Sequence, residues 1–179
     1  MTRDRAPSLP KRDPNGHKGT FGTVAIVGGC DREGLTMLGA PVLAGRGALR
    51  SGVGLCRLAV PATLVTQALT LLPSAMASGF EDSAPAELPA CHAAVIGPGL
   101  GPAGDRDRPI FDLIKRSDVP TVIDADGLNA IAAGVLANRK LPDLSRCVVT
   151  PHPGEYDRLA EAVRLREDPR DPRARESAA

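Results

Sequence analysis

The chain has 179 residues, 42% of them hydrophobic, so wholesale disorder is excluded. Its 22 basic and 21 acidic side chains leave a net charge of +1, which gives no electrostatic footprint for nucleic acid or for an anionic membrane. The longest apolar stretches are interrupted well short of a membrane span. We therefore expect no nucleic-acid partner and no membrane partner, and a chain of this length needs no disulfide or metal to fold.

The cysteines indicate a cellular compartment, and the composition of the two chain ends indicates the bounds of the folded domain. Segment 1–18 is charged and proline-rich without an apolar stretch, which argues against a secretory signal. We expect 1–16 to be a flexible N-terminal segment, 17–165 to be the folded domain, and 166–179 to be a charged tail or truncated helix. The cysteines form no Cys-x-x-Cys pair and are predicted to be buried thiols of a reducing cytoplasm: Cys30, Cys56, Cys91 and Cys147.

Apolar runs of strand length alternate with helical segments along the chain. The runs are continuous rather than alternating with polar residues, which is typical of parallel strands covered on both faces. The predicted strands are 23–27, 54–60, 93–96, 121–124 and 147–150; the predicted helices are 36–50, 61–71, 109–116, 126–138 and 154–165; and 78–89 is predicted to be a loop. This order favours an α/β fold with an open parallel sheet, in which ligands bind outside the carboxyl ends of the strands.

Glycines follow the first and third predicted strands. The helix after the first strand is rich in small residues, for which tight packing is favoured over close approach of a ligand. After the third strand, Gly99, Gly101 and Gly104 match a GxGxxG dinucleotide fingerprint, with Asp124 standing 20 residues further on. Prolines around this loop delay the helix that the fingerprint requires. The loop is therefore predicted either to face an anion or a flat ring through its backbone N–H groups, or to be a plain turn.

Polar side chains follow the fourth and fifth predicted strands. Asp124, Asp126 and Asn129 would hold a Mg²⁺ shell or a substrate hydroxyl, whereas a helix N-cap would account for only one of the acids. Prolines on both sides of His152 fix its backbone and predict a rigidly presented imidazole. The absence of GxxxxGK[ST], GxSxG and HExxH motifs removes the main support for P-loop, α/β-hydrolase and zincin functions.

Taken in order, these segments resemble the ADP/ATP-dependent NAD(P)H-hydrate dehydratases. The resemblance extends from about His17 to Leu159 and rests on residues 17–22, 39–44, 48–55, 97–101, 124–129 and 150–155. It implies a three-layer α/β/α, ribokinase-like fold with a mostly parallel sheet, incomplete at its C-terminal side. It also implies a repair reaction: ADP or ATP phosphorylates the ring hydroxyl of hydrated NADH or NADPH, and loss of the phosphate restores the reduced cofactor.

The same resemblance implies roles for individual residues. Glu155 would stand where related kinases keep a carboxylate linked to Mg²⁺. The residues implied to contact or line the substrate site are Ala40, Gly99, Gly101, Asp124, Asp126, Asn129 and His152.

The sequence also departs from the family pattern. It lacks the Gly-Ser-Gly-Asp helix start that would bind the nucleotide phosphates and supply the catalytic base. We therefore expect the chain alone to be inactive or incomplete, with an open sheet edge that invites a complementing C-terminal fragment or a homo-oligomer. Two alternatives remain: a fragment of a ribokinase-like vitamin or sugar kinase, and a non-catalytic dinucleotide-binding half-domain.

Overall fold

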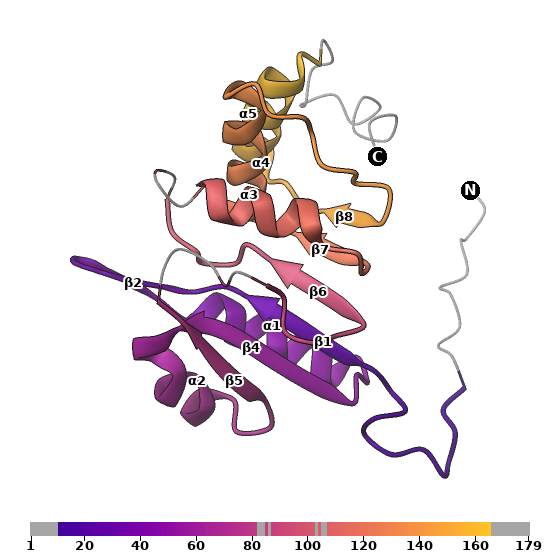
Figure 1. Cartoon of the computed structure of the whole chain (residues 1–179). Coiled ribbons are helices and arrows are strands. Elements are labelled where there is room, and N and C mark those ends of the chain that lie inside the picture. The colour runs from indigo at the N-terminus through magenta and orange to yellow at the C-terminus, as the bar shows by residue number, and fades with distance from the viewer. Residues whose placement is uncertain (1–10, 82–84, 86, 103, 105–106, 166–179) are drawn as a thin grey trace, which may run out of the picture.

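The computed structural model describes residues 11–81, 85, 87–102, 104 and 107–165. Its main sheet contains six strands in the order β5-β4-β1-β6-β7-β8, and every neighbouring pair is parallel (Figure 1). A separate antiparallel hairpin is formed by β2 and β3. The strands are β1 (Thr23–Val27), β2 (Cys30–Arg32), β3 (Leu35–Met37), β4 (Leu55–Pro61), β5 (Met76–Phe80), β6 (Ala93–Ile96), β7 (Thr121–Ile123) and β8 (Cys147–Val149).

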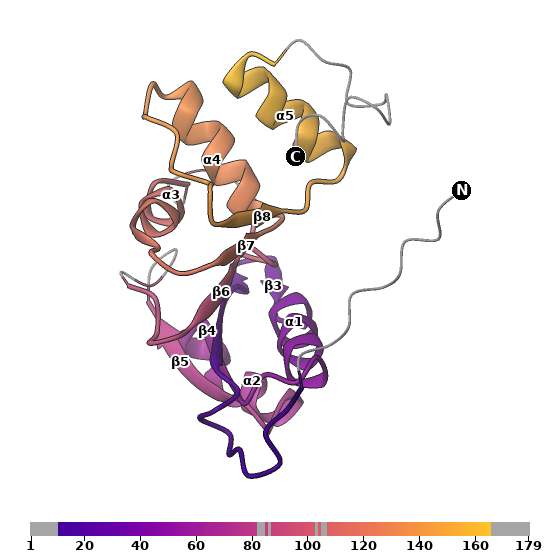
Figure 2. The same cartoon turned by 90° about the vertical axis from the view of Figure 1, so that its right-hand side faces the viewer.

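Helices cover both faces of this sheet. They are α1 (Gly39–Arg50), the 3-10 turn η1 (Ala62–Leu64), α2 (Val65–Leu71), α3 (Asp107–Arg116), α4 (Asp126–Leu136) and α5 (Pro153–Val163). Adjacent strand residues point to opposite faces, so Ile26 packs in a core with α1 and α2, whereas Val27 packs in a core with α3 and α4. Figure 2 shows α1 and α3 on opposite sides of the sheet. The predicted α/β/α layering is confirmed.

Two segments differ from the sequence-based predictions. Residues 78–80, predicted to begin a loop, form the end of β5, which pairs in parallel with β4. This strand is largely exposed and lacks the continuous apolar run that marked the others. Residues 36–37, predicted to start a helix, belong to β3, and α1 begins at Gly39. The helical pattern was extended too far because the hairpin strands are only three residues long.

The strand order creates a topological switch point beside β1. From β1 the chain moves outward through β4 to β5, and it then returns to the other side of β1 and moves outward through β6, β7 and β8. Loops after β1 and β6 therefore leave the sheet in opposite directions. In open α/β sheets the crevice at this point, outside the carboxyl ends of the strands, is where ligands bind.

Strand β8 forms one edge of the sheet. Among the described strands it pairs only with β7. Both of its valines are exposed, Val148 by 61% and Val149 by 42%. An unpaired strand edge with exposed apolar side chains is a template for pairing with another chain segment. Within residues 11–165, as far as they are described, no helix is long and apolar enough to cross a membrane.

Two helical glycines predict opposite effects on stability. Gly134 in α4 faces the Phe111 ring of α3 so closely that a Cβ would clash with it, whereas a Cβ at Gly47 in α1 would meet nothing within 4 Å. Gly134→Ala is expected to lower the free energy of unfolding by about 1–3 kcal/mol through overpacking. Gly47→Ala is expected to raise it by up to about 1 kcal/mol through helix propensity. Chemical denaturation of both variants checks this, and a shift of the same sign in both would contradict the packing argument.

Candidate functional site

The register of the sheet places four strand ends in one row. Val27 is aligned with Ile96, Ile96 with Ile123, and Ile123 with Val149. The residue that follows each strand donates its N–H to the neighbouring strand: Gly97 to Val27, Asp124 to Ile96, and Thr150 to Ile123, at 3.1, 3.1 and 3.2 Å. The predicted glycine loop, acidic strand end and His-Pro-Gly-Glu turn therefore leave the sheet at the same edge.

The glycine loop lies against the start of α1. Gly99 has φ +69°, and a Cβ built on it would lie 3.7 Å from the Cβ of Ala40. Ala40 is exposed in the first turn of α1, which no side chain caps. The structure thus brings together Ala40 and Gly99, two residues predicted for the site, in a wall made of backbone and small side chains at the switch point.

Asp126 links the glycine loop to α4 and α5. Its Oδ2 accepts the Gly101 N–H at 2.8 Å, and its Oδ1 accepts Asn129 Nδ2 at 3.2 Å. Asn129 Oδ1 in turn accepts the Nε–H of Arg158 in α5 at 2.9 Å. Because its N–H is engaged with Asp126, Gly101 positions the carboxylate here. Asp126, Asn129 and Arg158 also line a cavity of about 340 Å³.

The two acids of the strand end are separated by a strained residue. Ala125 has φ +47° and ψ −118°, a conformation that an alanine rarely adopts. On one side of it, Asp124 Oδ1 accepts the Thr150 hydroxyl at 2.9 Å, and on the other side Asp126 holds the glycine loop. Such strain persists where the surroundings over-determine the backbone, and it is concentrated at functional sites.

A third acid lies close to this network. Burial raises the pKa of Asp107, the first residue of α3, and the negative charge of Asp126 raises it further, while a hydrogen bond from the Gly104 N–H acts in the opposite direction. Helix α3 begins after Gly104, as the prolines of this loop predicted, so the GxGxxG spacing does not carry the helix start of a Rossmann fingerprint.

His152 caps helix α5. Its Nδ1 accepts the Gly154 N–H at 3.0 Å, so Nε2 carries the ring proton of the neutral imidazole and faces Glu155 Oε1 at 3.0 Å. The other oxygen of Glu155 accepts the His152 backbone N–H at 2.9 Å, which completes a capping box. Both ring nitrogens are therefore engaged within the turn. The side chain is 63% exposed, so contact with a substrate through the ring stays a prediction.

Glu155 does not provide a magnesium site by itself. Its side chain is 7% exposed; Oε2 accepts the His152 backbone N–H, and Oε1 lies 3.0 Å from His152 Nε2. The described residues contain no group of three or more His, Cys, Asp or Glu side chains that would hold a metal ion. The implied link between Glu155 and Mg²⁺ stays a prediction that requires oxygen donors from outside these residues.

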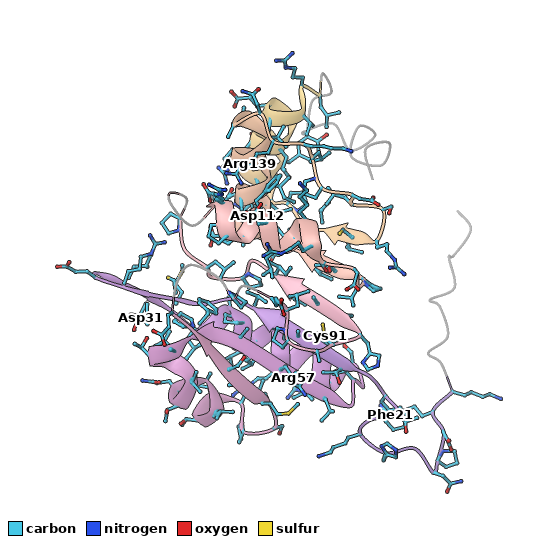
Figure 3. All side chains as sticks on the ribbon, in the orientation of Figure 1. Phe21, Asp31, Arg57, Cys91, Asp112 and Arg139 are labelled. Carbon is cyan, nitrogen blue, oxygen red and sulfur yellow. The ribbon has the colours of Figure 1, made fainter. Side chains whose placement is uncertain are left out.

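Burial raises the thiol pKa of three of the cysteines. All four are free. Burial raises the pKa of Cys56 to about 11, and it also raises the pKa of Cys91 and of Cys147. Cys91 lies near Arg57, on a different part of the molecule from Asp31 of the hairpin (Figure 3). Thiolate chemistry is therefore not supported at these three positions.

The sequence reasoning missed Thr150 and Arg158 as members of the site, and it did not find the β2–β3 hairpin. Glu33-Gly34 between Arg32 and Leu35 is a two-residue turn in which Gly34 has φ +75° and Glu33 does not have a positive φ. The glycine is the one turn signal in this segment, but Glu-Gly is not one of the pairs that strongly predict a two-residue hairpin. Arg158 follows Glu155 on α5 by one helical turn, but only the structure shows that it reaches Asn129.

Comparison with known proteins decides the family. Residues 24–179 match the family model described as NAD(P)H-hydrate dehydratase. The chain belongs to the NAD(P)H-hydrate dehydratase family. It is 40% identical over 166 residues to the bifunctional NAD(P)H-hydrate repair enzyme Nnr of Salinibacter ruber, covering 84% of this chain and 29% of that protein. It is 36% identical over 156 residues to the ADP-dependent (S)-NAD(P)H-hydrate dehydratase of Bacillus subtilis, covering 85% of this chain and 52% of that protein.

Solved structures confirm the ribokinase-like fold. The ADP/ATP-dependent NAD(P)H-hydrate dehydratase of Bacillus subtilis, co-crystallised with ATP/Mg²⁺, is 34% identical with a TM-score of 0.66, covering 86% of this chain and 52% of its own. A ribokinase-like superfamily protein from Enterococcus faecalis matches with a TM-score of 0.72 at 22% identity, covering 93% of this chain and 57% of its own. The chain thus spans about half the length of the single-function relative, and less than a third of the bifunctional one.

Proposed function

We propose that this chain forms the substrate side of an ADP- or ATP-dependent NAD(P)H-hydrate dehydratase. The observation that carries the proposal is the convergence of the Gly99–Ala40 wall and the Asp126 network at one edge of the sheet, in a chain of this family. The substrate would be hydrated NADH or NADPH. The nucleotide would phosphorylate its ring hydroxyl, and loss of that phosphate would restore the reduced nicotinamide.

The residues of this chain would bind and orient the hydrate. Ala40 and Gly99 leave space for a flat ring to approach the backbone. Asp124, Asp126 and Asn129 would line the floor, with Thr150 and Arg158 fixing two of them through hydrogen bonds. His152 would contact the substrate through its exposed ring. None of these contacts supplies the phosphate cradle or the general base of the reaction, so the proposed role of this chain is positioning.

Completion of the site would require a further polypeptide segment on the β8 side. A second, apolar cavity of about 490 Å³ lies between α4, β8 and α5, beside the open strand edge. The Tyr156 hydroxyl at this cavity is buried and has no hydrogen-bond partner within the described structure. Apolar surface, an unpaired strand edge and an unsatisfied hydroxyl together favour a covering strand and helix. We propose a complementing C-terminal segment as the partner, with self-association of this chain as the alternative occupant.

The test separates binding from catalysis. The chain is incubated with hydrated NADH and ADP, or with hydrated NADH, ATP and Mg²⁺, and recovery of the reduced nicotinamide is followed by absorbance. We expect binding of hydrated NADH without recovery for the chain alone. Recovery is expected once the C-terminal half of the Bacillus subtilis relative is added as a separate polypeptide. Sedimentation of the chain alone checks self-association.

Two results would count against the proposal. Failure of the chain to bind either hydrated dinucleotide would remove the substrate assignment. Binding without recovery in the complemented mixture would favour the non-catalytic dinucleotide-binding alternative. The two curated relatives named above are hydrate-processing enzymes, which favours dehydration over a vitamin or sugar kinase. The free cysteines favour a reducing compartment, and we propose the cytoplasm.

A further inference from the structure

The β2–β3 hairpin carries an arginine to the glycine loop. Arg32, at the end of β2, donates Nη2–H to the Pro102 carbonyl at 3.1 Å, across 70 residues of sequence. A Cβ on Gly101 would clash with the same guanidinium. Glycine at this position thus permits the approach of a cation to the loop that also contains Gly99. The hairpin and the loop meet beside the switch point where ligands bind.

The positive charge of Arg32 is not matched within the described part of the chain. Its Nε is buried and has no hydrogen-bond partner. Its guanidinium forms none of the ion pairs found among the described residues. A guanidinium has five N–H donors in a planar fork, and one bond to a carbonyl leaves most of that capacity unused. A buried hydrogen-bond donor without a partner lowers the free energy of unfolding, so we expect Arg32 to bind an acceptor that is not part of the described chain.

The hairpin does not need Arg32 as its main anchor. The adjacent Asp31 accepts the hydroxyl of Thr36 at 2.8 Å within the hairpin and the hydroxyl of Thr63 at 2.6 Å in η1. These two hydrogen bonds, Thr63 first, lower the pKa of Asp31. One oxygen of this carboxylate thus binds within the hairpin and the other fastens the hairpin to η1, and neither forms an ion pair with Arg32.

We propose that Arg32 is a specificity-determining residue that binds a phosphate group of the ligand, with the pyrophosphate of the dinucleotide as its target. The inference rests on the proposed function for the identity of the dinucleotide. A planar guanidinium pairs with two phosphate oxygens at once, and the partnerless Nε and the neighbouring Nη form such a fork. The nucleotide co-substrate also carries phosphates, so the two sources share one chemistry and the experiment distinguishes them.

The experiment measures dissociation constants of the full chain for four probes: NADH, dihydronicotinamide riboside, ADP and inorganic pyrophosphate. The variants are Arg32→Gln and Arg32→Lys. The matched control is Arg46→Gln, since Arg46 also donates a single Nη2 hydrogen bond to a carbonyl, that of Leu71 at 2.8 Å. Arg32→Gln is expected to weaken NADH binding by about 10- to 100-fold, the loss of one charge-assisted contact. Arg32→Lys is expected to fall between wild type and Arg32→Gln because it keeps the charge without the fork.

Each outcome bears on the proposal. The proposal is supported if Arg32→Gln loses affinity for NADH and for pyrophosphate but keeps its affinity for the riboside, while Arg46→Gln keeps the wild-type affinities. A loss confined to ADP and pyrophosphate assigns the phosphate to the nucleotide and overturns the dinucleotide as target. Equal losses for NADH and the riboside, or none in either Arg32 variant, overturn the proposal. A wild-type chain that binds pyrophosphate through Arg32 but binds no dinucleotide contradicts the proposed function alone. If the melting curve shows that Arg32→Gln does not fold, the affinities of Arg32→Lys for the same four probes decide between these outcomes.

Discussion

Asp126→Asn is expected to weaken the binding of hydrated NADH by about 100-fold. The carboxylate accepts two hydrogen bonds, from the Gly101 N–H and from Asn129 Nδ2. An asparagine has one acceptor oxygen, so its NH2 group would face either the Gly101 N–H or Asn129 Nδ2, and two hydrogen-bond donors would then oppose each other. Each hydrogen bond to a charged group is worth about 1.5–3 kcal/mol, and 1.4 kcal/mol corresponds to a tenfold change in affinity. Titration of hydrated NADH against the variant checks the expectation.

Asp143→Asn is the matched control for this prediction. Asp143 also holds a backbone N–H, that of Ser145 at 2.9 Å, but it is exposed and lies outside the row of strand ends. We expect its replacement to leave the affinity for hydrated NADH unchanged. An Asp126→Asn variant with native affinity, or one whose loss is matched by Asp143→Asn, would contradict the role assigned to the Asp126 network.

Glu155→Ala is expected to lower the free energy of unfolding by about 2–4 kcal/mol. The substitution removes one half of the capping box, together with a buried carboxylate that accepts the His152 backbone N–H and lies 3.0 Å from the imidazole Nε2. A lost cap costs about 0.5–2 kcal/mol, and a lost hydrogen bond to a charged group about 1.5–3 kcal/mol. Glu155→Gln is expected to lose nearly as much because, when its amide oxygen accepts the His152 backbone N–H, its amide NH2 group faces His152 Nε2 in place of a carboxylate oxygen. Thermal unfolding followed by circular dichroism measures both variants.

An exposed glutamate on the same helix provides the control. Glu161→Gln removes an equal charge from α5 without touching the capping box, and we expect a change within about 0.5 kcal/mol, as for ordinary surface substitutions. A loss below about 1 kcal/mol for Glu155→Ala would show that the start of α5 is held by packing rather than by its hydrogen bonds.

The central strands could be predicted from the sequence for a simple physical reason. Strands β1 and β6 contribute side chains to the helix-covered cores on both faces of the sheet, so their sequences are continuous apolar runs, each followed by a glycine. Strand β5 lies at an edge of the sheet and is mostly exposed, so its residues lack that pattern. The hairpin strands are shorter than any run that periodicity can detect.

The candidate site could be located from the sequence, but its contacts could not. Residues that follow parallel strands must meet at one edge, which was enough to group Asp124 with His152 and the glycine loop. The bonds within the group depend on side-chain directions. The sequence predicted a fixed His152, but it did not show that both imidazole nitrogens are engaged in its own turn. It likewise gave no reason to connect Arg32 with Pro102.

The alignment of the strand ends makes ligand binding sensitive to how the sheet has assembled. Each group in the row is set by a backbone hydrogen bond to the strand beside it. A slip of one residue between neighbouring strands would shift that group by about 3.3 Å, and it would move every side chain of the strand to the opposite face of the sheet. Molecules that have collapsed with mispaired strands would therefore keep much of their helix content yet lose affinity. Titration with substrate can thus report the fraction of refolded molecules that have reached native pairing.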